Sequence, residues 1–154
     1  MKMSPKFTKA QANMQPGVIT SDGFLGDDGR NLVDIIEADE ERFTSLGIDF
    51  EEVVRKLRYL LEQGRRGLGE PVTVDGEWIV QTSEARGHLP SPFEDGIFRK
   101  VNADIELAPQ GHGSGERLLV SDLSIHMIEK NHFLQGKGSP FRLEPEQLKK
   151  VLLL

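Results

Sequence analysis

The chain has 154 residues, a mass of 17.2 kDa, a formal net charge of −6 and 37 % hydrophobic residues. A chain of this length buries about 68–70 % of its unfolded surface, which suffices for a core without disulfides or a structural metal. The lack of cysteine excludes thiol nucleophiles, thiolate-held iron–sulfur clusters, zinc fingers and disulfide frameworks. No apolar run approaches the roughly 18 residues that cross a bilayer, and no signal peptide is recognisable. We therefore expect a soluble, cytoplasmic, acidic protein without membrane contact.

The charge is distributed unevenly along the chain. Residues 22–52 hold eleven acidic side chains and two arginines, whereas residues 55–66 hold five basic side chains and one glutamate. Neighbouring blocks of opposite charge are typical of complementary, solvent-exposed helix faces. A nucleic-acid surface around Arg65 and Arg66 is not expected, because the chain is acidic and this basic stretch has few aromatic residues.

The first predicted elements are an arm and a pair of helices. Residues 1–16 are polar and basic and show no hydrophobic periodicity, so we expect a flexible N-terminal arm, followed by a single α+β domain over residues 17–154. After a glycine-rich loop, a helix ends at Gly47 and a second begins after Asp49. Each helix has one apolar stripe, formed by Leu32, Ile35, Ile36, Phe43 and Leu46 in the first and by Phe50, Val53, Val54, Leu57, Leu60 and Leu61 in the second.

Four strands are predicted after this helical pair. Asp75-Gly76 separates two β-rich runs, 71–74 and 77–82, and is the strongest short-range signal for a hairpin. Residues 87–96 are predicted to be a proline-stiffened loop, and residues 97–107 alternate in the manner of a strand with one solvated face. Residues 117–120 make the fourth strand. Two successive hairpins predict a four-stranded antiparallel meander.

Two C-terminal helices complete the prediction. Residues 122–131 are apolar around much of the helix, so we expect this helix to be well buried. Pro145 opens a last short helix, because proline is favoured in the first turn. Since the strands are grouped between groups of helices, the fold class is α+β rather than α/β.

The first candidate site lies on the helix over residues 122–131. His126 and Glu129 are three residues apart and share a helix face, so Glu129 could orient the imidazole for acid–base catalysis. His132 could join them if the helix ends before it. A metal site is not expected, because His126 and His132 point about 120° apart on a helix, and no cofactor is indicated. The alternative is a structural histidine that bonds to a backbone carbonyl.

The second candidate site is the loop over residues 136–142. Its glycines expose backbone N–H groups near Lys137, Ser139 and Arg142, an arrangement that could hold an anion. The triplet Ser-Pro-Phe occurs at 91–93 and again at 139–141; if the two loops lie side by side, Phe93 and His88 would border the same pocket. The alternative is a connecting loop that Pro140 and Phe141 pin to the core.

These patterns favour two functions. The first is a small, non-catalytic cytoplasmic binding or regulatory protein with an unidentified protein partner, in which apolar helix faces could also support a homo-oligomer. The alternative is a small-molecule binder or an enzyme, with an acid–base and anion site built from the His126 helix and residues 136–142, and with a small anionic ligand. The sequence contains no Gly-x-Ser-x-Gly elbow and no dinucleotide fingerprint.

Overall fold

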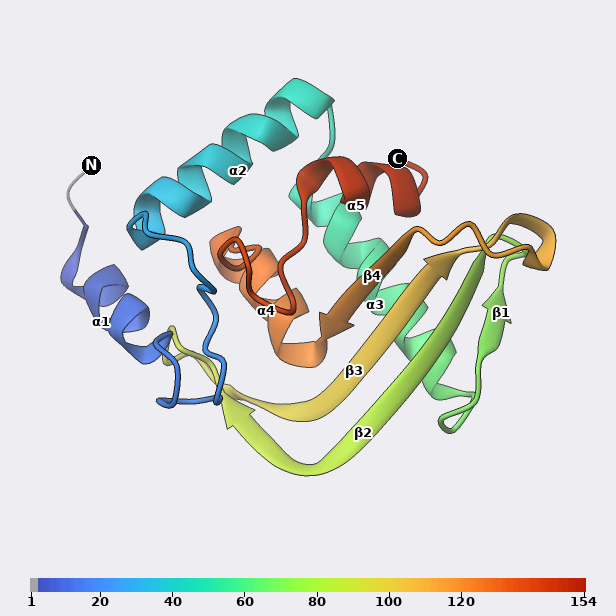
Figure 1. Ribbon diagram of the computed structural model, residues 1–154, viewed down its shortest axis with the longest axis horizontal. Helices are drawn as coiled ribbons and strands as arrows, with labels where there is room; N and C mark the ends of the chain where they lie inside the picture. Colours follow the sequence, from blue (N-terminus) through green and yellow to red (C-terminus); the bar gives the residue numbers. More distant parts are fainter. Residues whose placement is uncertain (1–2) are drawn as a thin grey trace.

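The structure is a computed structural model and describes residues 3–154. Three helices come first: α1 (Pro5–Asn13), α2 (Leu32–Leu46) and α3 (Phe50–Arg65). Strands β1 (Val72–Val74), β2 (Trp78–Pro90), β3 (Ile97–Leu107) and β4 (Arg117–Ser121) form one antiparallel sheet in chain order. Helices α4 (Asp122–Asn131) and α5 (Pro145–Val151) follow (Figure 1). The predicted α+β class, meander and C-terminal helices are confirmed. None of the described helices is long and apolar enough to span a bilayer.

The N-terminal part differs from the prediction. Residues 5–13 form helix α1 where we expected a flexible arm, so three helices precede the sheet instead of two. Ser4 caps α1 by accepting a hydrogen bond from the backbone N–H of Phe7, and the buried Ala10 and Met14 join a hydrophobic cluster. Met3, Phe7, Ala10 and Met14 recur at helical spacing, a stripe masked by the polar residues between them. Residues 1 and 2 of the predicted arm lie outside the described residues.

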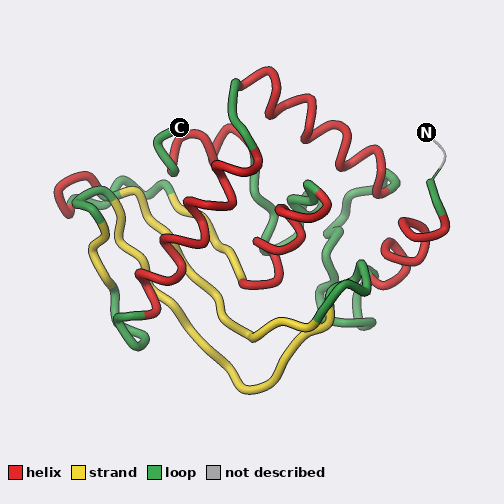
Figure 2. Tube along the Cα trace, turned by 180° about the vertical axis from the view of Figure 1, so that it is seen from behind, coloured by secondary structure: helices red, strands yellow, loops and turns green. Residues whose placement is uncertain are grey.

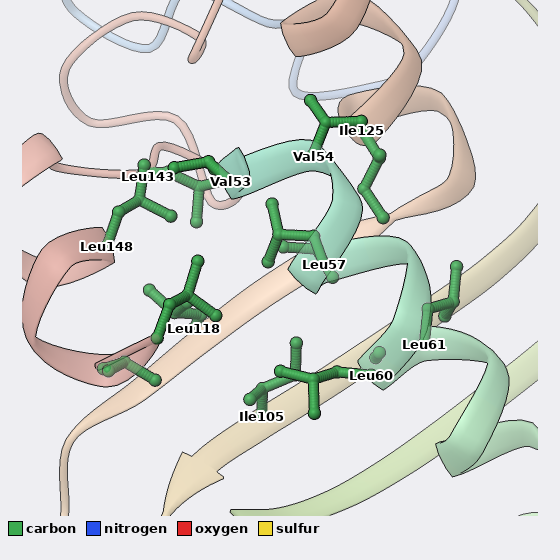
Figure 3. Packing of buried hydrophobic residues seen from close by; sticks show 14 of the residues in the cluster. Val53, Val54, Leu57, Leu60, Leu61, Ile105, Leu118, Ile125, Leu143 and Leu148 are labelled. Carbon is green, nitrogen blue, oxygen red and sulfur yellow. The ribbon is translucent and has the colours of Figure 1, made fainter. Parts of the chain in front are cut away.

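Helix α3 carries the main hydrophobic core (Figure 3). Its buried face packs against strands β3 and β4, helix α4, helix α5 and the segment before α5, through Val53, Val54, Leu57, Leu60, Leu61, Ile105, Leu118, Ile125, Leu143 and Leu148. A Cβ atom on Gly64 would lie 2.4 Å from Cγ1 of Val80, so glycine is what allows the end of α3 to approach β2. Each fully buried aliphatic side chain contributes about 1.5–3 kcal/mol to folding.

Helix α4 lies between two hydrophobic clusters. Ile125 and Ile128 belong to the main core, whereas Leu123 and Met127 belong to a second cluster, which also includes residues of α1 and α2. This double burial is the reason that the helix is apolar around most of its surface. The two predicted N-terminal helices do not run along each other as a packed pair, because α2 lies against α1 and α5 while α3 lies against the sheet and α4.

The β2–β3 hairpin is longer than predicted and extends past the rest of the sheet. Strand β2 continues to Pro90, through the first part of the predicted loop. The pairing register shifts between Ala85 and His88, and the hairpin bends sharply in its middle (Figure 2), as expected of a bulge. Its tip reaches α1, where Nδ2 of Asn13 donates to O of Pro92 at 2.9 Å. The hairpin tip thereby covers one side of the second hydrophobic cluster, to which it contributes Phe93.

Candidate functional site

A cavity of about 390 Å³ lies beside the point where the pairing of β3 with β4 ends. Its walls come from segments that are far apart in the sequence: the loop that carries Asp22 and Phe24, the middle of the β2–β3 hairpin, the start of α4, and the loop from Gln135 to Phe141. Ligand pockets typically occupy about 300–1,000 Å³, so this cavity has the size of a site for a small molecule.

A row of polar side chains forms one wall of the cavity. Ser83 on β2 pairs with Asn102 on β3, and Asn102 pairs with Ser121 on β4, so the three residues lie side by side across the sheet. The hydroxyl of Ser121 is already used, because it accepts a hydrogen bond from the backbone N–H of Ser124 at 3.0 Å. Within the described chain, the side chains of Ser83 and Asn102 form no hydrogen bond, so both are available to a ligand.

Another part of the cavity lining is apolar and held in place. Phe24 and Leu123 are 5 % and 3 % exposed, and Phe141 adds a second aromatic ring. The backbone of Phe24 is fixed on both sides, because its N–H donates to O of Met14 at 2.9 Å and its O accepts from N of Gly136 at 3.0 Å. These bonds tie the loop to the end of α1 and to the loop after α4, so the apolar wall is preformed.

Charged side chains lie at the exposed edge of the cavity. Glu84 and Arg99 each face another charge, since Oε1 of Glu84 lies 2.8 Å from Nη2 of Arg65 and Nε of Arg99 lies 3.8 Å from Oδ2 of Asp122. Asp22 and Lys100 also line the cavity, and neither forms an ion pair with any residue that the structure describes. The edge of the cavity therefore presents one acidic and one basic group that no described residue pairs with.

His126 does not line this cavity and contacts the tip of the hairpin. Its Nε2 is 3.0 Å from Oδ2 of Asp95, and its ring lies against Phe98 with 4.3 Å between the ring centres. Among the residues that the structure describes, Nε2 meets no acceptor in hydrogen-bond geometry, so the contact with Asp95 is close but not well aligned. Burial raises the pKa of Asp95, but Ser91 and His126 outweigh it and leave the pKa below its ordinary value. The contact links α4 to the hairpin tip.

The structure does not bring the three predicted catalytic residues together. Glu129 does not orient His126; its Oε1 lies 3.0 Å from Nη2 of Arg58 on α3. His132 ends α4 in a left-handed conformation, and its Nδ1 lies 2.7 Å from Oε2 of Glu40 on α2. Because packing of α4 against α2, α3 and the hairpin supplies a different partner for each residue, the expected acid–base group is not formed.

The loop over residues 136–142 already contacts acidic groups of the protein itself. The backbone N–H of Lys137 donates to Oδ2 of Asp28 at 3.1 Å, and the hydrogen bonds from Arg30 and then from Lys137 hold the pKa of Asp28 well below its usual range, against the effect of burial. The hydroxyl of Ser139 donates to Oε1 of Gln135 at 2.6 Å. Asp28 thus occupies the position that a bound anion would take at this backbone N–H.

Arg142 is likewise part of the protein's own framework. Its Nη1 and Nη2 donate to the carboxylate of Asp39 at 2.6 and 2.9 Å, and its Nε donates to Glu144 at 3.0 Å. Burial lowers the pKa of Arg142, but Asp39 and Glu144 outweigh it and raise the pKa above its ordinary value. The side chain is only 7 % exposed. The guanidinium is therefore not accessible to a ligand, contrary to the expectation that Arg142 helps to hold an anion.

The two Ser-Pro-Phe triplets do not border one pocket. Pro140 and Phe141 line the cavity, whereas Phe93 is buried at the hairpin tip, in edge contact with Phe7 and Phe133 at 6.1 and 5.9 Å. His88 is exposed on β2, where it pairs with Arg99 across the hairpin. Phe93 instead anchors its own loop in the second cluster.

The residues that shape the cavity carried no strong signal in the sequence. Ser83, Asn102 and Ser121 are common polar residues, and only the strand register places them in a row. The alternation over residues 97–107 did indicate a polar face, which includes Asn102. Among the described residues there is no group of three or more histidine, aspartate or glutamate side chains placed to hold a metal. No family model, curated protein or solved structure matches the chain.

Proposed function

We propose that the protein binds a small amphipathic organic molecule with an anionic group in the cavity beside Ser83 and Asn102, without catalysing its conversion. The observation that carries this proposal is the composition of the cavity: an apolar interior, a row of neutral hydrogen-bonding groups and, at the edge, the cation of Lys100, which has no ion-pair partner among residues 3–154. The proposal keeps the predicted small anionic ligand, but Ser83, Asn102 and Lys100 replace His126, Lys137, Ser139 and Arg142 as the groups that bind it; Pro140 and Phe141 of the loop line the cavity. The predicted protein partner and homo-oligomer stay predictions.

The parts of the cavity have different roles in this proposal. Burial of apolar ligand surface against Phe24, Leu123 and Phe141 supplies most of the affinity, at about 25 cal/mol per Å². Hydrogen bonds from Ser83 and Asn102 replace bonds to water, so each adds only about 0.5–1.5 kcal/mol and chiefly orients the ligand. Lys100 is exposed and screened by solvent, so its contribution is smaller than that of the apolar wall.

The test is a titration with the dye 1-anilinonaphthalene-8-sulfonate, an apolar anion that fluoresces in dry surroundings. We expect saturable binding of one dye per chain. The variant Ala85→Trp fills the cavity, because Ala85 lines it from β2, and is expected to abolish this binding. Ala38→Trp is the matched control, since Ala38 is exposed in the middle of α2, does not line the cavity, and should leave the titration unchanged.

Equal dye binding by the parent protein and Ala85→Trp would contradict the proposal, since the dye would then bind elsewhere. Urea unfolding of both tryptophan variants, followed by circular dichroism, shows that each has retained the fold. A cavity ligand also stabilises the native state by mass action. We therefore expect the dye to raise the urea midpoint of the parent protein and of Ala38→Trp, but not that of Ala85→Trp.

A further inference from the structure

We infer that the ligand is zwitterionic, an α-amino acid with a large apolar side chain. This inference rests on the proposed function and adds the ligand class. It comes from two charges at the edge of the cavity that have no ion-pair partner in the described part of the chain, the carboxylate of Asp22 and the ammonium of Lys100. A ligand with one charge of each sign would pair with both.

The other charged groups of the lining are already paired. Glu84 is neutralised by Arg65, whose Nη2 lies 2.8 Å from Oε1 of Glu84. Arg99 faces Asp122, with 3.8 Å between Nε and Oδ2. Among the described charges of the lining, the unpaired ones therefore sum to zero, with Asp22 on the loop before α2 and Lys100 on β3. A ligand with a net charge would leave one of these two groups facing a like charge or no partner.

The distribution of polar and apolar surface matches the chemistry of an α-amino acid. Asp22 and Lys100 are exposed, whereas Phe24 and Leu123 are buried, so charge lies at the edge and apolar surface inside. An α-amino acid carries its ammonium and carboxylate on one carbon, with the side chain directed away from both. Its head group would pair with Asp22 and Lys100 at the edge while the side chain fills the interior. The volume of about 390 Å³ is near the lower end of the range for ligand pockets, which favours a ligand of this size.

The first experiment compares amino acids with analogues that lack one charge. L-Phenylalanine, L-leucine and L-tryptophan are titrated into ¹⁵N-labelled protein, and the shifts of the Gly23, Ser83 and Asn102 amides give the dissociation constants. The analogues of phenylalanine are 3-phenylpropionate, which lacks the ammonium, and phenethylamine, which lacks the carboxylate. We expect at least one of the amino acids to bind and each analogue to bind about fivefold more weakly than phenylalanine, the upper range for one exposed ion pair.

The second experiment assigns each charge to its residue. Asp22→Asn should remove the preference for phenylalanine over 3-phenylpropionate but keep the preference over phenethylamine. Lys100→Gln should remove the preference for phenylalanine over phenethylamine but keep the preference over 3-phenylpropionate. The controls Glu70→Gln and Lys6→Gln make the same changes in net charge at exposed positions outside the lining, and both should keep both preferences.

The outcomes separate this inference from the proposed function. If 3-phenylpropionate binds as tightly as phenylalanine and Asp22→Asn changes neither affinity, the inference of a zwitterionic ligand is wrong, while the proposed small-molecule site stands. If neither the amino acids nor the analogues shift the cavity amides, but the dye binds there, the amino-acid class is again wrong and the site stands. If none of these probes, the dye included, binds at the cavity, both proposals fail. The inference is supported if Asp22→Asn loses only the preference over 3-phenylpropionate and Lys100→Gln loses only the preference over phenethylamine.

Discussion

The ion pair between Asp39 and Arg142 is the contact whose loss we expect to cost most among the polar interactions. The two side chains are 6 % and 7 % exposed and form a bidentate contact at 2.6 and 2.9 Å. Asp39→Asn removes the negative charge and leaves the buried guanidinium with the carboxylate of Glu144 and with O of Gln135, which accepts from Nη1 at 2.9 Å. Breaking a buried pair in this way costs about 3–5 kcal/mol. Because Glu144 still compensates part of the charge, we expect a loss of about 3 kcal/mol in the free energy of unfolding.

A second ion pair provides the control for this prediction. Arg42 on α2 and Glu146 on α5 form another ion pair, but their side chains are 47 % and 52 % exposed. Glu146→Gln should therefore cost less than about 1 kcal/mol, because solvent screens an exposed pair. Urea unfolding measures both losses, and at about 2–4 °C per kcal/mol the midpoint of thermal unfolding of Asp39→Asn should fall by about 6–12 °C.

The double variant Asp39→Leu with Arg142→Met tests the origin of the loss. If the loss comes from an uncompensated buried charge, replacing both charges with apolar side chains should recover most of it. The reasoning would be refuted if Asp39→Asn cost no more than Glu146→Gln. It would also be refuted if the double variant were less stable than Asp39→Asn, because the charge left unpaired would then not be the cause.

Three further predictions concern packing and pH. Gly136→Ala should cost about 1–3 kcal/mol, because a Cβ would lie 2.2 Å from O of Leu25, whereas Gly29→Ala, with nothing within 4 Å, should stay within about 0.5 kcal/mol; equal urea midpoints would contradict this. Leu57→Ala in the core should cost about 2–5 kcal/mol and Leu68→Ala, which is 92 % exposed, about 0.5 kcal/mol or less, as followed by the fluorescence of Trp78, the single tryptophan. Because the folded-state pKa of Asp28 is depressed, its stabilising contribution is present above the ordinary aspartate pKa of about 3.9 and is lost as the pH falls through the folded-state pKa. The free energy of unfolding of the parent protein should therefore fall more steeply below about pH 4 than that of Asp28→Asn, and parallel curves would argue against the role of Asp28.

Local signals predicted most of the secondary structure, because each is read within a few residues. The left-handed Gly47 ends α2, Asp49 caps α3, and Ser121 caps α4, each by a bond or a backbone conformation that needs no distant partner. Helix α1 was not predicted because its apolar stripe is short and because its stability depends on packing against the hairpin tip. The end of β2 was missed because a strand that contains Gly87 and a bulge resembles a loop.

The sequence by itself determined the α+β class, the order of the strands in the meander and the positions of most helices, because hydrophobic periodicity and caps act over short distances. Only the tertiary structure decided which polar groups remain free. Arg142 and Asp39 are 103 positions apart, and no local pattern shows that they pair. The same long-range packing pairs Glu129 with Arg58 and leaves Lys100 without an ion-pair partner among the described residues. A charge is available to a ligand only when the fold has not already paired it, so the candidate site became visible only once the chain was folded.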